Sequence, residues 1–222
     1  MQIGLISDIH GNLPALGTVL KDIPAVDIIV CVGDVIGYNP WPAECVERVR
    51  DVASVTVQGN HDRTVRTPER YRANQMAYAG LEYALAELSE DQLRWLDDLP
   101  RTEPVGEDRF LIVHDHPEVQ DRYVRPHMFS SLWSYLDGYD CLVLGHTHVQ
   151  HTEVVLTGSW SIPAASASHV MRILVQPTLS STLRRSVSIS AASRTISTEL
   201  STESRKWGSQ SKSARICLMA LD

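Results

Sequence analysis

Short apolar runs alternate with amphipathic stretches through the first two-thirds of the chain. Five runs rich in Val, Ile and Leu have the length of buried strands and cover residues 3–6, 28–32, 53–57, 110–113 and 141–144. Stretches with a helical spacing of apolar positions lie between and after these runs, at residues 13–20, 42–49, 71–88, 90–96 and 130–136. Strands that alternate with helices predict βαβ units and a parallel sheet, so we expect an α/β fold.

Polar residues that can bind metals follow each of the five predicted strands. The five pieces are Asp8-Ile9-His10, Gly33-Asp34, Gly59-Asn60-His61-Asp62, Val113-His114 and Gly145-His146-Thr147-His148. The carboxyl ends of parallel strands converge on one crevice in open α/β sheets. Because Asp, Asn and His offer oxygen and nitrogen ligands, we predict that these side chains meet at one metal site.

Each piece taken alone also has a purely structural interpretation. An isolated Asp-x-His is weak evidence for a ligand pair, and Asp34 taken alone is better explained as a helix cap or turn residue. Residues 59–62 have the composition of a polar β-turn, and His114 could be a buried histidine with a satisfied hydrogen bond. Two histidines at one strand end, His146 and His148, favour metal binding on their own. The five pieces together hold five of the nine histidines, and this joint occurrence favours the metal site.

The ordered set resembles the calcineurin-like metallophosphoesterase family, whose pattern is D-x-H, G-D, G-N-H-[DE], H and G-H-x-H. The resemblance runs from Met1 to about Val155. Within the family, Gly11-Asn12 and the stretch Gly37-Tyr38-Asn39-Pro40 look like the small bacterial and archaeal phosphodiesterase branch. The resemblance implies a metallophosphoesterase domain over residues 1–158, folded as a four-layer α/β/β/α sandwich whose C-terminal strands are lost or altered.

The resemblance also implies a role for each polar residue of the five pieces. Two divalent metal ions would be bound, the first by Asp8, His10 and His148 and the second by Asn60, His114 and His146, with Asp34 as the bridge. His61 would be the catalytic residue, as the acid or the transition-state stabiliser at the leaving oxygen. The mixed nitrogen and oxygen ligands suit Mn, Fe, Zn or Ni, and Mn²⁺ is the usual choice in the family.

A dinuclear metal centre predicts a hydrolytic reaction. Two divalent ions about 3.5–4 Å apart acidify a bridging water, hold phosphoryl oxygens and permit in-line attack on phosphorus. We therefore expect a metal-dependent phosphodiesterase that uses a metal-bridging hydroxide on a small phosphoester substrate. A phosphomonoesterase with the same centre, a catalytically silent scaffold of the same fold and a nuclease are the alternatives. No GxSxG, Walker loop or Cys–His pairing with comparable placement offers another catalytic centre.

Asp115 departs from the family pattern, because the position after His114 is often glycine. Its carboxylate would lie near the second metal or repel an anionic substrate, which bears on the substrate class more than on metal binding. Residues 63–80 and 115–135 would form the rim of the substrate site, with candidate contacts from Arg63, Arg66, Arg122 and Arg125. Solvated surface charge is the alternative interpretation of these arginines.

Composition and charge narrow the class of protein. The chain has 222 residues, 43% of them hydrophobic, and no apolar stretch near the roughly 20 residues that cross a bilayer. Residues 1–6 lack the basic region and cleavage site of a signal peptide. The cysteines Cys31, Cys45, Cys141 and Cys217 form no CxxC pair and indicate reduced thiols, so we expect a cytoplasmic protein with no membrane partner. Residues 1–159 hold 24 acidic and 12 basic residues, which argues against a nucleic-acid partner, while a homo-oligomer stays open.

The sequence changes character after about Gly158. Residues 160–222 contain 15 serines, 3 acidic and 8 basic residues, with no clear strand or helix period outside residues 170–175. One interpretation is an atypical, disordered serine-rich tail over residues 159–222. The other is a single-nucleotide frameshift near Gly158, because an alternative frame can spell V-L-V-D-P-G-S-V-G-Q-P-R, which resembles the family's usual continuation.

Overall fold

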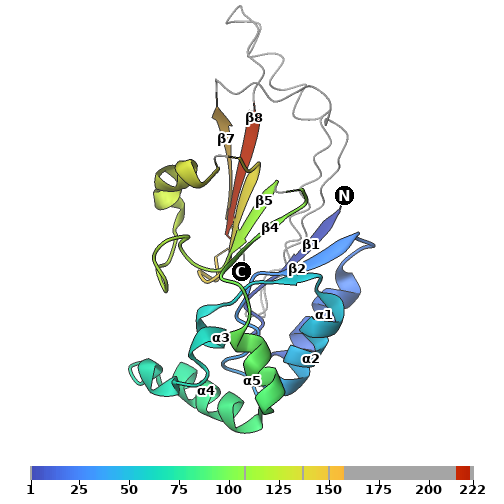
Figure 1. Cartoon of the computed structure of the whole chain (residues 1–222), viewed down its shortest axis with the longest axis vertical. Helices are drawn as coiled ribbons and strands as arrows, with labels where there is room; N and C mark the ends of the chain where they lie inside the picture. Colours follow the sequence, from blue (N-terminus) through green and yellow to red (C-terminus); the bar gives the residue numbers. More distant parts are fainter. Residues whose placement is uncertain (1, 108, 137, 150, 158–213, 221–222) are drawn as a thin grey trace, which may run out of the picture.

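The computed structural model describes residues 2–107, 109–136, 138–149, 151–157 and 214–220, and its strands form two sheets (Figure 1). The first sheet is parallel, with the strand order β1 (Ile3–Ile6), β2 (Ile28–Cys31) and β3 (Val55–Thr56). The second has the order β4 (Thr102–Val105), β5 (Phe110–Val113), β6 (Cys141–Leu144), β8 (Ala214–Ala220) and β7 (His151–Thr157). In the second sheet, β5, β6 and β8 are parallel, whereas β4 and β7 pair antiparallel at the edges.

Helices connect and cover the strands. The α-helices are α1 (Leu13–Asp22), α2 (Pro42–Val52), α3 (Asn60–Thr64), α4 (Gln75–Glu87) and α5 (Glu90–Asp97), and the 3₁₀ helices are η1 (Pro68–Tyr71) and η2 (Pro126–Leu136). The Asn12 side chain caps α1 by accepting a hydrogen bond from the Ala15 N–H. A reciprocal capping box between Ser89 and Gln92 begins α5. These caps explain why the helices predicted at 13–20 and 90–96 are present with ends within two residues of the prediction.

Three groups of buried apolar side chains separate four layers. The first group lies between the α-helices and the three-stranded sheet and includes Ile6, Leu16 and Leu81. The second lies between the two sheets and includes Leu5 and Val143, so neighbouring residues of β1 face opposite layers. The third packs the outer face of the second sheet against η2, the yellow-green helix of Figure 1. This order confirms the predicted α/β/β/α sandwich, with a 3₁₀ helix as its last layer.

The helix predicted over residues 71–88 was wrong at its beginning. The 3₁₀ helix η1 ends at Tyr71, and α4 begins only at Gln75. The Asn74 side chain accepts a hydrogen bond from the Ala77 N–H and so caps α4. The chain between η1 and α4 is therefore not helical, and Tyr71 and Asn74 at its two ends line the cavity described below.

Three elements of the sheets and their cover also differ from the prediction. The strand predicted at 53–57 pairs with β2 over two residues only. The helix predicted at 130–136 begins earlier, at Pro126, and is a 3₁₀ helix. The edge strand β4 was not predicted, because it contains Pro104, which a strand tolerates only where one side of the ladder is unpaired.

The strand β8 lies within residues 159–222, a segment for which one interpretation was a disordered tail. That interpretation is wrong for residues 214–220. The strand is inserted between β6 and β7 and pairs with both. Residues 216–220 form an apolar run like those that predicted β2 and β6, and this run was overlooked at the end of the serine-rich segment. Residues 158–213, including the candidate period at 170–175, lie outside the described residues. The frameshift near Gly158 stays a prediction that the gene sequence tests.

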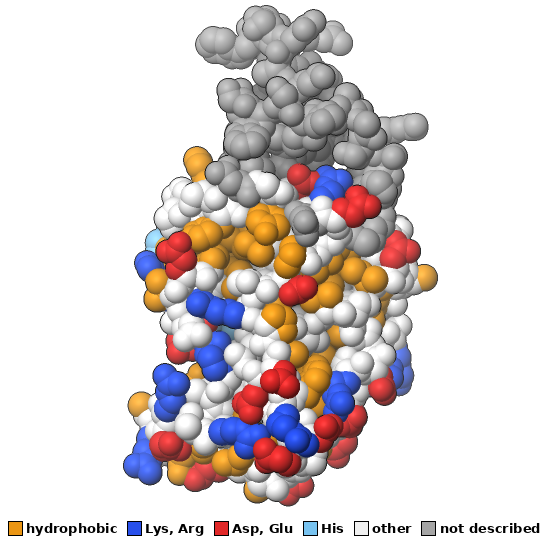
Figure 2. Space-filling view, viewed as in Figure 1, with side chains coloured by type: hydrophobic (Ala, Val, Ile, Leu, Met, Phe, Trp, Pro, Cys, Tyr) orange, Lys and Arg blue, Asp and Glu red, His pale blue; other side chains and the backbone are white. Residues whose placement is uncertain are grey.

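The visible surface carries mixed charge over the helical part of the molecule. Figure 2 shows Lys and Arg side chains interspersed with Asp and Glu in the lower half, where Figure 1 places α4 and α5. Arg50 and Arg66 pair with carboxylates of α5. In the described part of the chain no helix has both the length and the apolar character that a membrane span requires. Cys31, Cys45 and Cys141 are buried free thiols, as predicted for these three cysteines.

Candidate metal centre

The seven predicted metal ligands lie at the edge where β1, β2, β5 and β6 end. Each lies within four residues of the end of one of these strands, except Asn60, which begins α3 after β3. Five of the seven have a left-handed backbone with φ between 51° and 71°, namely Asp8, His10, Asp34, His146 and His148. Few residues other than glycine adopt this conformation, and non-glycine residues that do so cluster at active sites and ligand-binding sites. It turns the chain sharply after each strand.

Asp8, His10 and His148 form the first group of candidate ligands. One ligand atom from each lies within 4.8 Å of the others. The Oδ1 atom of Asp8 lies 3.2 Å from Nε2 of His148 and 3.9 Å from Nε2 of His10, and the two Nε2 atoms lie 3.1 Å apart. Ser7 donates its hydroxyl to Oδ2 of Asp8 at 2.5 Å and orients the carboxylate. These three residues are the ones predicted for the first ion.

Asp34, His114 and His146 form the second group, again with ligand atoms within 4.8 Å of one another. Nε2 of His114 lies 3.0 Å from Oδ1 of Asn60 and 3.3 Å from Oδ2 of Asp34. The same Asp34 oxygen lies 3.7 Å from Nε2 of His10 in the first group. Its carboxylate therefore faces both groups, as a bridging ligand must, and the assignment of two ions stays a prediction.

Backbone carbonyls fix the orientation of two imidazole rings. Nδ1–H of His10 donates to the Ile36 carbonyl at 3.3 Å, and Nδ1–H of His114 donates to the Val32 carbonyl at 2.7 Å. When such a ring is neutral, as a metal ligand must be, Nε2 is the lone-pair nitrogen and faces the centre, as in protein metal sites. The buried Nε2 of His146 has no hydrogen-bond partner among the described residues. A divalent cation at the centre would give these ring nitrogens and the carboxylates around them a common partner, so the residues fit such an ion.

Burial and charge shift the pKa values of these groups in opposite directions. Burial favours the neutral forms of Asp34 and His114, but their mutual attraction outweighs it. It holds the pKa of Asp34 well below its usual range and raises the pKa of His114 to about 10. For Asp8, burial is outweighed by the hydrogen bond to His148, which lowers the pKa. A divalent cation would stabilise the same ionised carboxylates that a protonated histidine stabilises here.

His61 lies in the first turn of α3, between the two groups of ligands and the cavity above them. Its backbone N–H donates to Oδ1 of Asp34 at 2.8 Å. Its ring centroid lies 4.7 Å from that of His10 and 5.0 Å from those of Tyr38 and Tyr71. Burial lowers the pKa of His61 to about 4, so the imidazole is neutral near pH 7. The ring also approaches His10 and Asp34 closely enough to join them as a ligand group.

The turn that carries Asn60 and His61 is held by Gly59 and Asp62. The buried Asp62 carboxylate accepts hydrogen bonds from three backbone N–H groups, those of Val35, Ile36 and Gly59, at 2.9, 3.2 and 3.0 Å. A side chain at residue 59 would collide with the carboxylate and backbone of Asp34. The glycine therefore permits the close approach of the loops after β2 and β3.

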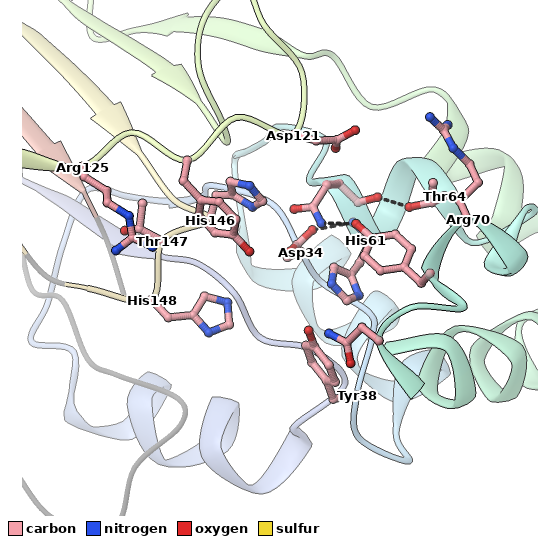
Figure 3. Close-up of a pocket in the computed structure, with 14 residues that line it drawn as sticks. Asp34, Tyr38, His61, Thr64, Arg70, Asp121, Arg125, His146, Thr147 and His148 are labelled. Atoms are coloured by element: carbon pink, nitrogen blue, oxygen red, sulfur yellow. Dashed lines mark hydrogen bonds between the residues drawn. The ribbon is translucent and has the colours of Figure 1, made fainter. Parts of the chain in front are cut away.

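A cavity of about 580 Å³ opens over both ligand groups (Figure 3). Its wall includes four of the predicted ligands, Asp34, Asn60, His146 and His148, together with the predicted catalytic His61. The remaining wall is aromatic and polar and comprises Tyr38, Thr64, Arg70, Tyr71, Asn74, Asp121, Tyr123, Arg125 and Thr147. Figure 3 shows Arg125 and Thr147 on one side of Asp34 and Arg70 and Thr64 on the other.

Of the four arginines predicted at the substrate rim, only Arg125 lines this cavity. Arg63 is committed to Asp115 and Asp121, and Arg66 pairs with Glu90 and Asp97 at the surface. Arg122 is exposed and is not part of the wall. The alternative interpretation as surface charge therefore holds for Arg66 and Arg122. Arg70, within the predicted rim segment 63–80, was not singled out by its sequence.

Asp115 neither joins a ligand group nor lines the cavity in the described structure. Its buried carboxylate lies 3.2 Å from Nη2 of Arg63 and 3.6 Å from Nη2 of Arg101. It also accepts a hydrogen bond from the Asp121 N–H at 2.7 Å. The predictions that Asp115 lies near the second metal or repels the substrate are therefore wrong. The carboxylate instead ties the loop after β5 to α3.

Two tyrosines in contact with predicted ligands were missed in the sequence. The Tyr71 hydroxyl accepts a hydrogen bond from Nδ2 of Asn60 at 2.5 Å. The amide oxygen of Asn60 then faces Nε2 of His114. The Tyr123 ring stacks on His146, with centroids 4.1 Å apart and an interplanar angle of 10°. Both residues fall in the predicted rim segments. No strand-end signal marks them, because they lie in η1 and in a long loop.

A two-sheet α/β sandwich with Asp, Asn and His side chains grouped at its strand ends defines the metallophosphoesterase class of proteins. The family model for calcineurin-like phosphoesterases matches residues 1–150. The chain belongs to this family, which confirms the resemblance that the five sequence pieces carry.

Two relatives have about one-third of their aligned residues in common with this chain. The uncharacterized protein MJ0912 of Methanocaldococcus jannaschii is 34% identical over 156 residues, which cover 67% of this chain and 63% of the relative. The crystal structure of a metallophosphoesterase from Sphaerobacter thermophilus is 33% identical with a TM-score of 0.59, covering 69% and 63% of the two chains. The chain thus spans 63% of the length of each relative.

A third similarity concerns the fold alone. The hypothetical protein PH1004 from Pyrococcus horikoshii OT3 has 18% identity and a TM-score of 0.58, and the alignment covers 67% of this chain and 70% of that one. The two-sheet architecture is therefore present at low sequence identity as well.

Proposed function

We propose that this protein is a metal-dependent phosphodiesterase that acts on a small phosphoester. The observation that carries the proposal is the convergence of acceptor atoms: Nε2 of His114 lies 3.0 Å from the Asn60 amide oxygen and 3.3 Å from the Asp34 carboxylate. Without metal, protonated His114 supplies the positive charge between these oxygens, and a bound divalent cation would take its place. The family supports phosphoester hydrolysis as the use of such a cation.

Each residue has a definite task in the proposed reaction. The ligand groups of Asp8 and of His114 would each hold one divalent ion, with Mn²⁺ as our first choice, and Asp34 would contact both. The bound ions would supply an acidified water and positive charge for the phosphoryl oxygens. His61, neutral near pH 7, donates a ring N–H to the leaving oxygen. Its backbone bond to Asp34 keeps the ring above the ligand groups.

The cavity favours a diester over a monoester. Its volume of about 580 Å³ is in the range of pockets that enclose whole small molecules and exceeds the need of one phosphoryl group. The wall extends on both sides of Asp34, toward Arg125 and toward Arg70 (Figure 3). A phosphodiester has an ester group on each side of phosphorus, so both directions can be filled.

The test is turnover of chromogenic phosphoesters by metal-stripped protein after addition of Mn²⁺, Ni²⁺, Fe²⁺ or Zn²⁺. We expect no hydrolysis after chelation, recovery with Mn²⁺, and faster cleavage of bis(p-nitrophenyl) phosphate than of p-nitrophenyl phosphate. Faster cleavage of the monoester would refute the phosphodiesterase and indicate a phosphomonoesterase. Absence of turnover with all four metals would refute the enzyme and favour the scaffold.

A matched pair of histidine variants shows whether this turnover belongs to the proposed site. His61→Asn is expected to lower kcat about 10²–10⁴-fold, because the positioned donor at the leaving oxygen is lost, while metal content stays the same. His127→Asn changes an exposed histidine outside the cavity wall and should leave kcat unchanged. Wild-type kcat in His61→Asn would assign the leaving-group role to another residue.

A further inference from the structure

Two arginines of the cavity wall have no task in the proposed reaction. Arg70 belongs to η1, and Arg125 lies directly before η2. Figure 3 shows them on opposite sides of Asp34 and His61. The cavity therefore has one guanidinium on each flank of the candidate metal centre.

Neither arginine forms an ion pair with a carboxylate in the part of the chain that the structure describes, which distinguishes them from Arg63. Apart from Asp34, the only carboxylate of the cavity wall is Asp121. It lies 2.7 Å from Nη2 of Arg63 and is thereby neutralised. The Arg125 guanidinium lies 5.7 Å from the centroid of the Tyr123 ring, a contact that favours one placement of the side chain. The two arginines of the wall thus have no carboxylate partner among the described residues, although Asp34 and Asp121 belong to the same wall.

A simple phosphodiester does not match this distribution of charge. Its one negative charge sits on the phosphoryl group, which the proposed reaction places at the ligand groups of Asp8 and Asp34. Its neutral ester groups would extend toward the two guanidiniums. A planar guanidinium suits phosphate oxygens, to which it donates two parallel hydrogen bonds. The positions of Arg70 and Arg125 therefore match an anionic group beyond the reacting phosphorus.

We infer that the substrate is a phosphodiester that carries a second phosphoryl group, bound by Arg70 or Arg125. The inference rests on the proposed phosphodiesterase function. Hydrolysis breaks one P–O ester bond, adds the hydroxyl of water to phosphorus and gives its remaining proton to the leaving oxygen. The second phosphoryl group is unchanged. Arg70 and Arg125 thus determine specificity and do not contact the reacting atoms.

Two pairs of substrates test the inference with the Mn²⁺-loaded full chain. Thymidine 5′-(p-nitrophenyl phosphate) is compared with its 3′-phosphorylated derivative, and thymidine 3′-(p-nitrophenyl phosphate) with its 5′-phosphorylated derivative. The members of a pair differ by one phosphoryl group. We expect kcat/KM to be at least about tenfold higher for the phosphorylated member of one pair, mainly through a lower KM. The preference should decrease as ionic strength rises.

Charge-removing variants connect the preference to the two arginines. In the double variant Arg70→Gln/Arg125→Gln we expect the ratio of kcat/KM within the preferred pair to fall to about one. Arg122→Gln removes an exposed arginine next to Tyr123 that is outside the cavity wall, and it should keep the wild-type ratio. The ratio compares two substrates of one protein sample, so a change in the folded fraction cancels.

The outcomes separate the inference from the function on which it rests. Two results would refute the inference that Arg70 or Arg125 binds a second phosphoryl group of the substrate. One is equal kcat/KM within both pairs for the wild-type chain, and the other is a preference that persists in the double variant. Hydrolysis of the unphosphorylated members would then still support the phosphodiesterase. If no member of either pair is hydrolysed in the presence of metal, the proposed function itself fails.

Discussion

Replacement of Asp115 by asparagine should loosen the loop that carries Asp121 and Tyr123 over the metal centre. Asp115→Asn keeps the size of the side chain and removes its charge. The side chain of Asp115 is 1% exposed and that of its partner Arg63 is 16% exposed, with Nη2 and Oδ2 3.2 Å apart. The pair therefore lies largely outside the screening of water and should contribute more than a surface ion pair.

The size of the effect follows from distance and burial. Two unit charges 3.2 Å apart attract each other by about 5 kcal/mol at an effective dielectric constant of about 20. The cost of removing both groups from water offsets a large part of this attraction. Arg63 also keeps its contact with Asp121 at 2.7 Å, which limits the loss. We expect a coupling free energy of about 2 kcal/mol between Asp115 and Arg63.

A double-mutant cycle of Asp115→Asn and Arg63→Gln measures this coupling from urea unfolding of the metal-free protein. The contact of Arg63 with Asp121 is lost in both arms that contain Arg63→Gln, so it cancels from the coupling. The exposed pair Arg66–Glu90 serves as the control, because its side chains are 38% and 64% exposed, and its coupling should be clearly smaller. A coupling below about 0.5 kcal/mol for Asp115 and Arg63 would show that the ion pair does not hold the loop.

Two further substitutions probe the packing around the ligands. Gly37→Ala should destabilise the fold by about 1–3 kcal/mol in thermal unfolding and reduce turnover, because φ is +151° and the new Cβ would lie 2.7 Å from Nδ1 of His10. Gly17→Ala, in α1 with open space around it, should instead be neutral or stabilising, and equal losses in both would contradict this reasoning. Tyr71→Phe removes the hydroxyl that orients Asn60 and should weaken metal affinity about 10–100-fold by titration calorimetry, whereas unchanged affinity would exclude this orienting role.

The grouping of the candidate ligands could be predicted from the sequence because strands fix positions. An apolar run predicts a buried strand, and a polar residue directly after it must lie at the strand end. The runs before Asp8, Asp34, His114 and His146 are all strands of the structure, and their carboxyl ends meet. The apolar runs were therefore sufficient to predict that side chains more than 100 positions apart in the sequence lie close together.

The cavity wall could not be predicted in the same way. Tyr123 and Arg125 lie in a loop that the ion pair of Asp115 and Arg63 connects to α3, and the two residues of this pair are 52 positions apart. Tyr71 reaches Asn60 only because α4 begins late, at its own cap. Such contacts depend on loop conformation, for which hydrophobic periodicity gives no signal. The strand β8 is a different case, because its apolar run at residues 216–220 was present in the sequence but lies at the end of the serine-rich segment and was not recognised.

The left-handed backbone at the strand ends links the stability of the centre to its chemistry. Asp8, His10 and Asp34 have φ values of 52°, 51° and 53°, a conformation that costs an L-residue about 1–2 kcal/mol. The loops offset this cost together, because the Asp8 N–H donates to the Gly33 carbonyl at 3.0 Å and the His10 N–H donates to the Asp34 carbonyl at 2.9 Å. Each strained turn is thus held by the backbone of the other. We therefore expect a change in the loop after β2 to displace Asp8 and His10 as well as Asp34, so that it affects both ligand groups.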